Sequence, residues 1–312
     1  MIPLLVGISI LSFAVIHLAP GDPVDLLVER TATPEQRAIV RQIYGFDEPV
    51  TTQYWLWFTR LLRGDFGTSF VQGRAVLDMY MERLPNTLYL NFFTLMVIYM
   101  VGLPVGIISA LRQYSRLDHC VTTVAFWGQA MPSFWLAYVL IFFVALRVDF
   151  IPISGMATYG YTVAQVGWWS VLADRFRYLI LPVAVMAFSG IAIYARYMRS
   201  SMLEVIRQDY VRTARSKGLT EKVVMYRHAL RNALLPIITL LGMELPILFA
   251  GSVIIEMIFS WPGLGLLSFR SIMQRDYVVV MAFNTIGALL MVMGNFLADV
   301  LYAVADPRIK YS

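Results

Sequence analysis

The side chains with the clearest capacity for specific chemistry are nine arginines and lysines between positions 196 and 231. Three acidic residues accompany them, so this segment has a net charge of +6, while the whole chain has +5. The cations are Arg196, Arg199, Arg207, Arg212, Arg215, Lys217, Lys222, Arg227 and Arg231. In a membrane protein, short loops rich in Lys and Arg stay in the cytoplasm. The local patterns described below predict a helix, a glycine break and a second helix in this segment, a shape that suits docking to a soluble partner.

Three carboxylates lie within or beside long apolar runs, where an ionised side chain is costly and often functional. Two interpretations of Glu244 stay open: it lines a polar pathway across a membrane, or it makes a structural hydrogen bond to a neighbouring helix or subunit. Glu256 lies near the outer end of its run and is predicted to be an interface or gate residue. Asp299 lies near an inner end, where we expect it to pair with Arg196 or Arg199.

The composition places these groups in a membrane protein. Hydrophobic residues make up 59% of the 312 residues, charged residues make up 14%, and the mean hydropathy is +0.66. A soluble domain of this length would expose far too much apolar surface. The single cysteine, Cys120, excludes an internal disulfide, and three scattered histidines argue against a histidine metal site. No basic stripe interleaved with stacking aromatics appears outside the loops, which argues against nucleic-acid binding.

Six apolar runs have about the length that a helix needs to cross the hydrocarbon core. They cover residues 2–18, 84–111, 119–146, 178–195, 233–255 and 278–303. The short segments 112–118, 196–232 and 304–312 carry the concentrated Lys and Arg excess that marks cytoplasmic loops. The sequence therefore predicts an all-α, polytopic membrane protein with six transmembrane helices and both termini in the cytoplasm.

The predicted spans divide the chain into three parts. Residues 1–19 form the first transmembrane helix, and residues 20–83 form an extracytoplasmic region with short surface helices over 34–44 and 51–62. Residues 84–312 form a five-helix core that includes a cytoplasmic loop, 199–232. Within this core, Pro132 is predicted to kink the third span.

Local patterns in the basic segment predict two helices with a break between them. Met202, Val205, Ile206 and Tyr210 recur at helical spacing, which indicates one apolar side. Gly218 can end a helix by adopting a positive φ angle. Thr220, two residues later, can cap the helix that follows.

The start of the chain carries a separate expectation. The first span is short and no Lys or Arg precedes it, so we expect the natural protein to begin upstream with a short basic segment. A cleaved signal peptide is the alternative. No small-residue cleavage site precedes the stop at residues 20–23 (PGDP), which favours a retained helix.

Several motifs together resemble one family, the permease subunits of binding-protein-dependent ABC importers, and in particular its dipeptide/oligopeptide branch. Residues 209–219 (DYVRTARSKGL) and 228–236 (HALRNALLP) resemble its cytoplasmic signature loop. That signature is usually written Glu-Ala-Ala, three residues, then Gly. Here Arg212, Thr213 and Ala214 take the first three places and Gly218 the last. The likeness extends to residues 20–23, 259–265 (FSWPGLG), 275–277 (RDY) and 306–308 (DPR).

The resemblance implies a subunit that forms half of a translocation pathway in a bacterial or archaeal cytoplasmic (inner) membrane. Its partners would be a second homologous permease, two cytoplasmic ATPase subunits, an extracytoplasmic solute-binding protein, a peptide substrate and the lipid bilayer. Loop 199–232, here named the coupling loop, would sit in a groove of one ATPase. The residues that the resemblance assigns to this contact are Tyr210, Arg212, Thr213, Ala214, Arg215, Lys217, Gly218 and Leu219. Thr213, Ala214 and Ser216 can form a small face for close approach.

The energy source and the cargo follow from the same resemblance. The sequence has no Gly-x-x-x-x-Gly-Lys-Ser/Thr phosphate loop, so ATP and Mg are expected at the partner ATPases, with no cofactor on this chain and no enzyme activity of its own. Di- or oligopeptides are the expected cargo, with nickel complexes or glutathione as alternatives. A different class, an ion- or proton-coupled secondary transporter, remains open, although no internal repeat is evident.

Overall fold

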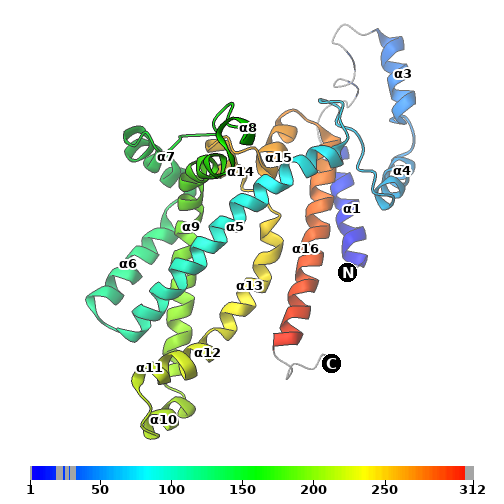
Figure 1. Cartoon of the computed structure of the whole chain (residues 1–312). Coiled ribbons are helices and arrows are strands. Elements are labelled where there is room, and N and C mark those ends of the chain that lie inside the picture. The colour runs from blue at the N-terminus through cyan, green and yellow to red at the C-terminus, as the bar shows by residue number, and fades with distance from the viewer. Residues whose placement is uncertain (1, 19–23, 25–27, 29–32, 306–312) are drawn as a thin grey trace. The chain divides into compact units, whose positions relative to one another are not determined.

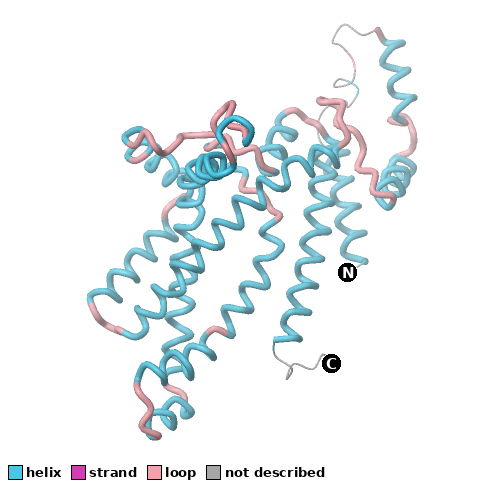
Figure 2. Tube along the Cα trace, viewed as in Figure 1, coloured by secondary structure: helices cyan, strands magenta, loops and turns pink. Residues whose placement is uncertain are grey.

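The computed structural model describes residues 2–18, 24, 28 and 33–305, which form helices joined by loops (Figures 1 and 2). The chain divides into two compact units. Unit 1 comprises Met1–Thr87, Phe249–Val253 and Gly263–Met293. Unit 2 comprises Leu88–Leu248, Ile254–Pro262 and Gly294–Ser312. The predicted all-helical class is confirmed.

Unit 1 contains the short helices that the sequence predicts after the first span. Its helices are α1 (Ile2–His17), α3 (Pro34–Tyr44), α4 (Val50–Leu62), the start of α5 (Val76–Leu111), α15 (Leu264–Met273) and most of α16 (Tyr277–Ala305). Helix α3 has the predicted bounds because Thr33 and Gln36 form a reciprocal capping box at its start. Gly45, with φ of 70°, ends it in the left-handed conformation.

A buried carboxylate fixes the irregular segment before α5. Asp276, which is 1% exposed, accepts a hydrogen bond of 2.5 Å from the Ser69 hydroxyl. The backbone N–H groups of Phe70 and Val71 donate to the same carboxylate at 3.2 and 3.4 Å. Next to it, Val76, Met79 and Tyr80 of α5 pack into a cluster with apolar residues of α15 and α16.

Unit 2 is built around the 39-residue helix α9. Its other elements are the remainder of α5, α6 (Arg116–Ala130), α7 (Ser133–Phe143), η1 (Ala145–Arg147), α8 (Val163–Val166), α9 (Trp168–Ile206), α10 (Asp209–Ser216), α11 (Glu221–Val223), the π-helix η2 (Val224–Ala229), α12 (Leu230–Ala233), α13 (Leu235–Leu248) and most of α14 (Val253–Ile258). At the first turns of α9, the Asp174 carboxylate accepts two hydrogen bonds of 2.7 Å from the N–H and hydroxyl of Thr158.

Helices α5 and α9 approach each other closely where glycines line the contact. A β-carbon at Gly106 would clash with the carbonyl oxygen of Ala195, and one at Gly190 would clash with the side chain of Ile98. Small residues at helix contacts let backbones come near each other in membrane proteins. The crossing of α5 and α9 therefore depends on these glycines.

Three helices within the described residues are long and apolar enough to cross a membrane: Val76–Leu111, Trp168–Ile206 and Tyr277–Leu297. They contain most or all of the predicted second, fourth and sixth spans. Helix α9 is about twice as long as its predicted span, because it continues into polar sequence at both ends. Helix α1 covers all but one residue of the predicted first span, and the total of six remains a prediction.

The third predicted span is not one kinked helix. Helices α6 and α7 are bent by 107° at a short break, which makes the pair a broken span or a re-entrant loop. Met131 has extended backbone angles of −83° and 120°, as expected for a residue that precedes proline. Pro132 then caps the start of α7, so it separates two helices where the sequence suggested a kink.

The fifth predicted span is also interrupted. Helix α13 ends at Leu248, and α14 begins at Val253 after a break of four residues. The interruption lies downstream of Glu244 and leaves Glu256 on the second, short helix.

Candidate functional site

The basic segment begins on the last turns of α9 and, from Arg207 on, continues as a chain of short helices (Figure 1). The predicted helix, glycine break and second helix are confirmed: α10 ends at Ser216, Gly218 has φ of 73°, and α11 begins at Glu221. Thr220 occupies the N-cap position of α11, but its hydroxyl makes no capping hydrogen bond. The backbone geometry, and not the side chain, therefore starts this helix.

The apolar side predicted over residues 202–210 does not belong to one helix. Helix α9 ends at Ile206, and the N–H groups of Arg207 and Gln208 close its last turn on Glu204 and Val205. The fully buried Met202 belongs to α9, whereas Tyr210 belongs to α10 and is 42% exposed. The helical spacing of these residues runs across a break that has no glycine or proline to signal it.

Helix α10 is seated by two small apolar side chains. Val211 and Ala214, three residues apart and both buried, join a cluster with Met198 and Met202 of α9 and with Ala110 at the end of α5. Ala214 therefore faces the core and cannot belong to an exposed small face. That face reduces to Thr213 and Ser216, whose hydroxyls donate to carbonyls of their own helix at 2.9 and 3.1 Å.

The cations of the coupling loop differ in how closely they pair with carboxylates. Arg215 reaches across Gly218 to Glu221, with nitrogen–oxygen distances of 2.8 and 3.3 Å. Hydrogen bonding from Arg215 lowers the pKa of Glu221, and the same bond raises the pKa of Arg215. Among the described residues, the ion pair of Arg212 is with Asp209 at 3.8 Å, and both side chains are largely exposed.

The outward surface of α10 and the turn after it carries the remaining predicted residues. Tyr210 and Leu219 are 42% and 40% exposed, and Arg212 and Lys217 are exposed as well. A β-carbon on Gly218 would meet nothing within 4 Å. The left-handed φ angle, and not lack of space, therefore favours glycine at this position.

The two candidate pathway carboxylates have different surroundings. The Tyr194 hydroxyl of α9 donates to Oε1 of Glu244 at 2.7 Å. This geometry matches a structural hydrogen bond between helices, while a role in the pathway stays a prediction. Glu256 is fully buried, as are Phe259 and Trp261 in the turn that follows. A gate or interface role for Glu256 would therefore require this turn to open.

A buried junction that includes the first residue of the coupling loop is not apparent from sequence patterns. Arg199 Nε and Nη2 donate to the two oxygens of Asp118 at 2.6 and 2.8 Å. The Ser109 hydroxyl and the Tyr114 N–H also donate to this carboxylate, at 2.5 and 2.9 Å. We name Ser109, Tyr114, Asp118 and Arg199 the Asp118 junction. It links the end of α5, the start of α6 and α9.

The junction contains a residue of one predicted contact. Arg199 was a candidate partner of Asp299, and among the described residues its acidic partner is Asp118. The side chain of Asp299 lies outside the described residues, as do the motifs at 20–23 and 306–308. The sequence offered one signal, because Ser115 caps the helix in which Asp118 is the third residue. Asp118 and Arg199 are 81 positions apart in the sequence, so no local pattern indicates that they pair.

Comparison with known proteins agrees with the motif pattern. Residues 102–311 match the family described as binding-protein-dependent transport system inner membrane component, and residues 1–91 match its N-terminal component. The oligopeptide transport system permease protein of Bacillus subtilis is 43% identical over 311 residues, covering 99% of this chain and 96% of that protein.

The names of two further relatives specify other cargo. The di/tripeptide transport system permease protein of Pseudomonas aeruginosa is 38% identical, covering 100% of this chain and 96% of that protein. The glutathione transport system permease protein of Salmonella paratyphi A is 34% identical with the same coverage. The chain therefore belongs to the family of binding-protein-dependent transport system inner membrane components, the permease subunits of ABC importers.

Proposed function

We propose that this chain is the permease subunit of an ATP-driven importer and forms half of a pathway for di- or oligopeptides. The observation that carries the proposal is the match over the full chain to permeases whose names specify oligopeptides and di- or tripeptides. Glutathione, itself a tripeptide, is the second candidate because a relative of similar coverage carries that name. A solute-binding protein would select the cargo outside the membrane.

The coupling loop is proposed to carry the contact with an ATPase subunit. Helix α10 is short and is seated on α9 by Val211 and Ala214, so a force on its outer face passes directly into α9. Tyr210, Arg212, Lys217 and Leu219 supply an exposed surface of mixed apolar and cationic character. Such a surface suits a groove with an apolar floor and an acidic rim.

The remaining assignments complete the proposal. A second homologous permease supplies the other half of the pathway, and two cytoplasmic ATPases bind ATP and Mg. The membrane is the cytoplasmic membrane of a bacterium or archaeon. Residues 1–19, 20–83 and 84–312 act as anchor helix, outside region and permease core, with six spans in all. The buried side chains of Phe259, Trp261 and Leu264 leave the outside region as the better candidate for contact with the binding protein.

Reconstitution tests the proposed function. Proteoliposomes that hold this chain, its partner permease and both ATPases should hydrolyse ATP faster when peptide-loaded binding protein is added. A loaded binding protein can shift the assembly only if it binds the outward-facing state better than the inward-facing one. Proteoliposomes with this chain alone should show no uptake. Uptake driven there by a proton or sodium gradient would establish the secondary-transporter alternative.

Cysteine labelling tests the proposed topology. Thr52→Cys on α4 and Ser216→Cys on α10 place one thiol in each exposed region, in a Cys120→Ala background because Cys120 is itself exposed. An impermeant thiol reagent added outside intact cells should label only Thr52→Cys. Labelling of both positions from one side would contradict the six-span arrangement.

A further inference from the structure

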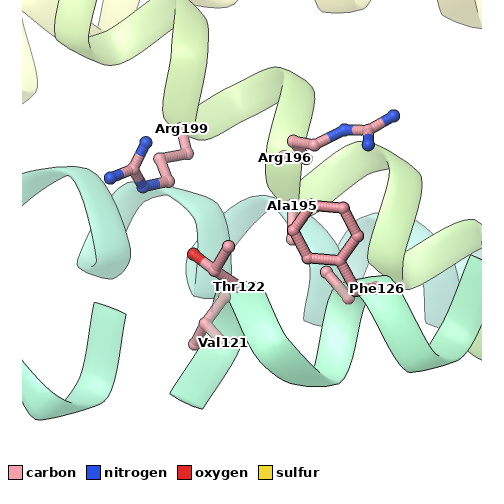
Figure 3. Close-up of a pocket in the computed structure, with 7 residues that line it drawn as sticks. Val121, Thr122, Phe126, Ala195, Arg196 and Arg199 are labelled. Atoms are coloured by element: carbon pink, nitrogen blue, oxygen red, sulfur yellow. The ribbon is translucent and has the colours of Figure 1, made fainter. Parts of the chain in front are cut away.

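A cleft between α6 and α9 has apolar walls and an arginine at its edge. Its volume is about 140 Å³, and its lining residues are Val121, Thr122, Ala125, Phe126, Ala195, Arg196 and Arg199. Figure 3 shows Arg196 and Arg199 on α9 beside Val121, Thr122 and Phe126 of α6. All these residues belong to unit 2.

The two arginines of the cleft differ in how their charge is compensated. Arg199 is bound on two nitrogens by Asp118. Arg196 donates to the neutral amide oxygen of Gln129 at 3.1 Å and has no carboxylate within 4.0 Å among the described residues. A guanidinium near hydrocarbon with only a neutral partner is costly. Among the described residues, the cleft therefore carries one positive charge without an acidic partner.

The position of Arg196 along α9 determines how deep its charge lies in the membrane. It directly follows residue 195, where the predicted fourth span ends, and the basic segment begins with it. A long arginine side chain at the end of a membrane span can place its charge at the polar surface of the bilayer while its stem stays in apolar surroundings. Phe126 and Trp127 beside the cleft are 64% and 65% exposed, which suits an apolar solvent.

We propose that the α6–α9 cleft binds one anionic phospholipid of the inner leaflet, with the phosphate on Arg196 and the start of an acyl chain between Val121, Ala125 and Phe126. Basic pockets between transmembrane helices on the cytoplasmic side suit anionic head groups. A stable protein contact would need about 800 Å² from each partner. A cavity of about 140 Å³ instead matches a short stretch of acyl chain. The proposal rests on the proposed topology.

Native mass spectrometry of the assembled transporter tests the site by titration with phosphatidylglycerol and, separately, phosphatidylcholine. The intact complex should retain phosphatidylglycerol in preference to phosphatidylcholine. Arg196→Gln should weaken phosphatidylglycerol binding about fivefold, because one arginine near the surface contributes about 1 kcal/mol to binding of anionic lipid. Arg196→Lys should bind phosphatidylglycerol within twofold of the parent protein. Because this variant keeps the positive charge, it separates loss of charge from misfolding.

Two more variants sharpen the test. Thr122→Trp keeps every charge but fills the cleft, so it should weaken phosphatidylglycerol binding as much as Arg196→Gln does. Arg227→Gln removes an exposed cation of η2 away from the cleft and should have no effect.

Three outcomes would overturn the proposal. Equal losses in Arg196→Gln and Arg227→Gln would mean diffuse attraction between the basic segment and the leaflet. Competition by free glycerol phosphate as strong as by phosphatidylglycerol would mean an anion site without a lipid. Binding by the isolated full chain but not by the complex would mean that the partner permease covers the cleft.

Discussion

The Asp118 junction and the helices of the coupling loop beyond it lie in the same unit, and both contain ion pairs. The pair of the junction is buried, whereas the pairs of those helices are exposed. In the junction, one buried carboxylate accepts four hydrogen bonds, two of them from Arg199. In the coupling loop, the pairs Arg215–Glu221 and Arg212–Asp209 are exposed, and Lys217 has no acidic partner among the described residues. Buried pairs are strongly destabilising to break, whereas exposed pairs contribute little. The junction therefore fixes structure, while the loop keeps cations available for a partner.

The largest effect is expected from Asp118→Asn. This change leaves the buried side of Arg199 without its counter-charge and should lower the free energy of unfolding by about 3 kcal/mol. Thermal unfolding in detergent micelles, followed by circular dichroism, measures the loss. Asp209→Asn is the matched control, since it breaks an exposed pair and should change stability very little. Equal melting temperatures for the two variants would show that the junction is not structural.

Gly218→Leu is expected to affect coupling more than folding. The β-carbon of the new side chain meets no atom within 4 Å, so the expected cost to the fold is backbone strain of about 1 kcal/mol. That side chain would nevertheless project from the turn between α10 and α11, where an ATPase surface is proposed to lie. Substrate uptake should collapse while membrane insertion stays normal.

A second glycine separates strain from coupling. Gly73 has φ of 64° and equally open surroundings, but it lies in the region 20–83. Gly73→Leu should show the same modest loss of stability and leave assembly with the ATPases unchanged. If both variants block that assembly, the role assigned to Gly218 is wrong.

Charge reversal of Lys217 should have a smaller effect on partner binding. Lys217→Glu places a like charge against the proposed acidic rim, so association with the ATPase should slow several-fold at low salt. The difference from the parent should shrink as ionic strength rises, because salt screens exposed charges. Arg227→Glu serves as a control outside the predicted contact residues. Surface plasmon resonance on the nanodisc-embedded permease gives the rates.

The smallest effect is expected from pH acting on Glu221. Its pKa in the folded protein is lowered from an ordinary value of 4.5, so the stabilisation is fully present above about pH 4.5 and is lost as pH falls through the lower, folded value. Because both side chains are largely exposed, the pair contributes about 0.5 kcal/mol or less. Amide hydrogen exchange across α10 and α11 should separate the parent from Glu221→Gln at pH 7, and this difference should shrink as the pH falls below about 4.5.

Sequence signals predicted the features of this fold whose causes lie within a few residues of them. The bounds of α3 follow from Thr33, Gln36 and Gly45, which all lie within or next to the helix. The break at Gly218 follows from one residue's φ preference. These features need no knowledge of the rest of the chain.

Features that depend on distant contacts were predicted poorly. Asp118 and Arg199 lie on separate helices, so each looked like an ordinary loop charge until the fold placed them together. Ala214 looked like part of an exposed small face, because its burial depends on the cluster around Met198 and Met202. The predicted fourth span is shorter than α9, because the apolar run ends at the first charged residues whereas the helix continues through them.

The length of α9 gives it the geometry of a rigid lever. At 1.5 Å per residue, its 39 residues extend for about 58 Å, from the Asp174 contact near one end to the seat of α10 at the other. A tilt of about 5° about the glycine-lined crossing with α5 would move the two ends in opposite directions, and by about 5 Å relative to each other. A force on α10 would therefore displace the loop that holds Thr158 at the opposite end of α9. The side chains between the two ends would not need to rearrange.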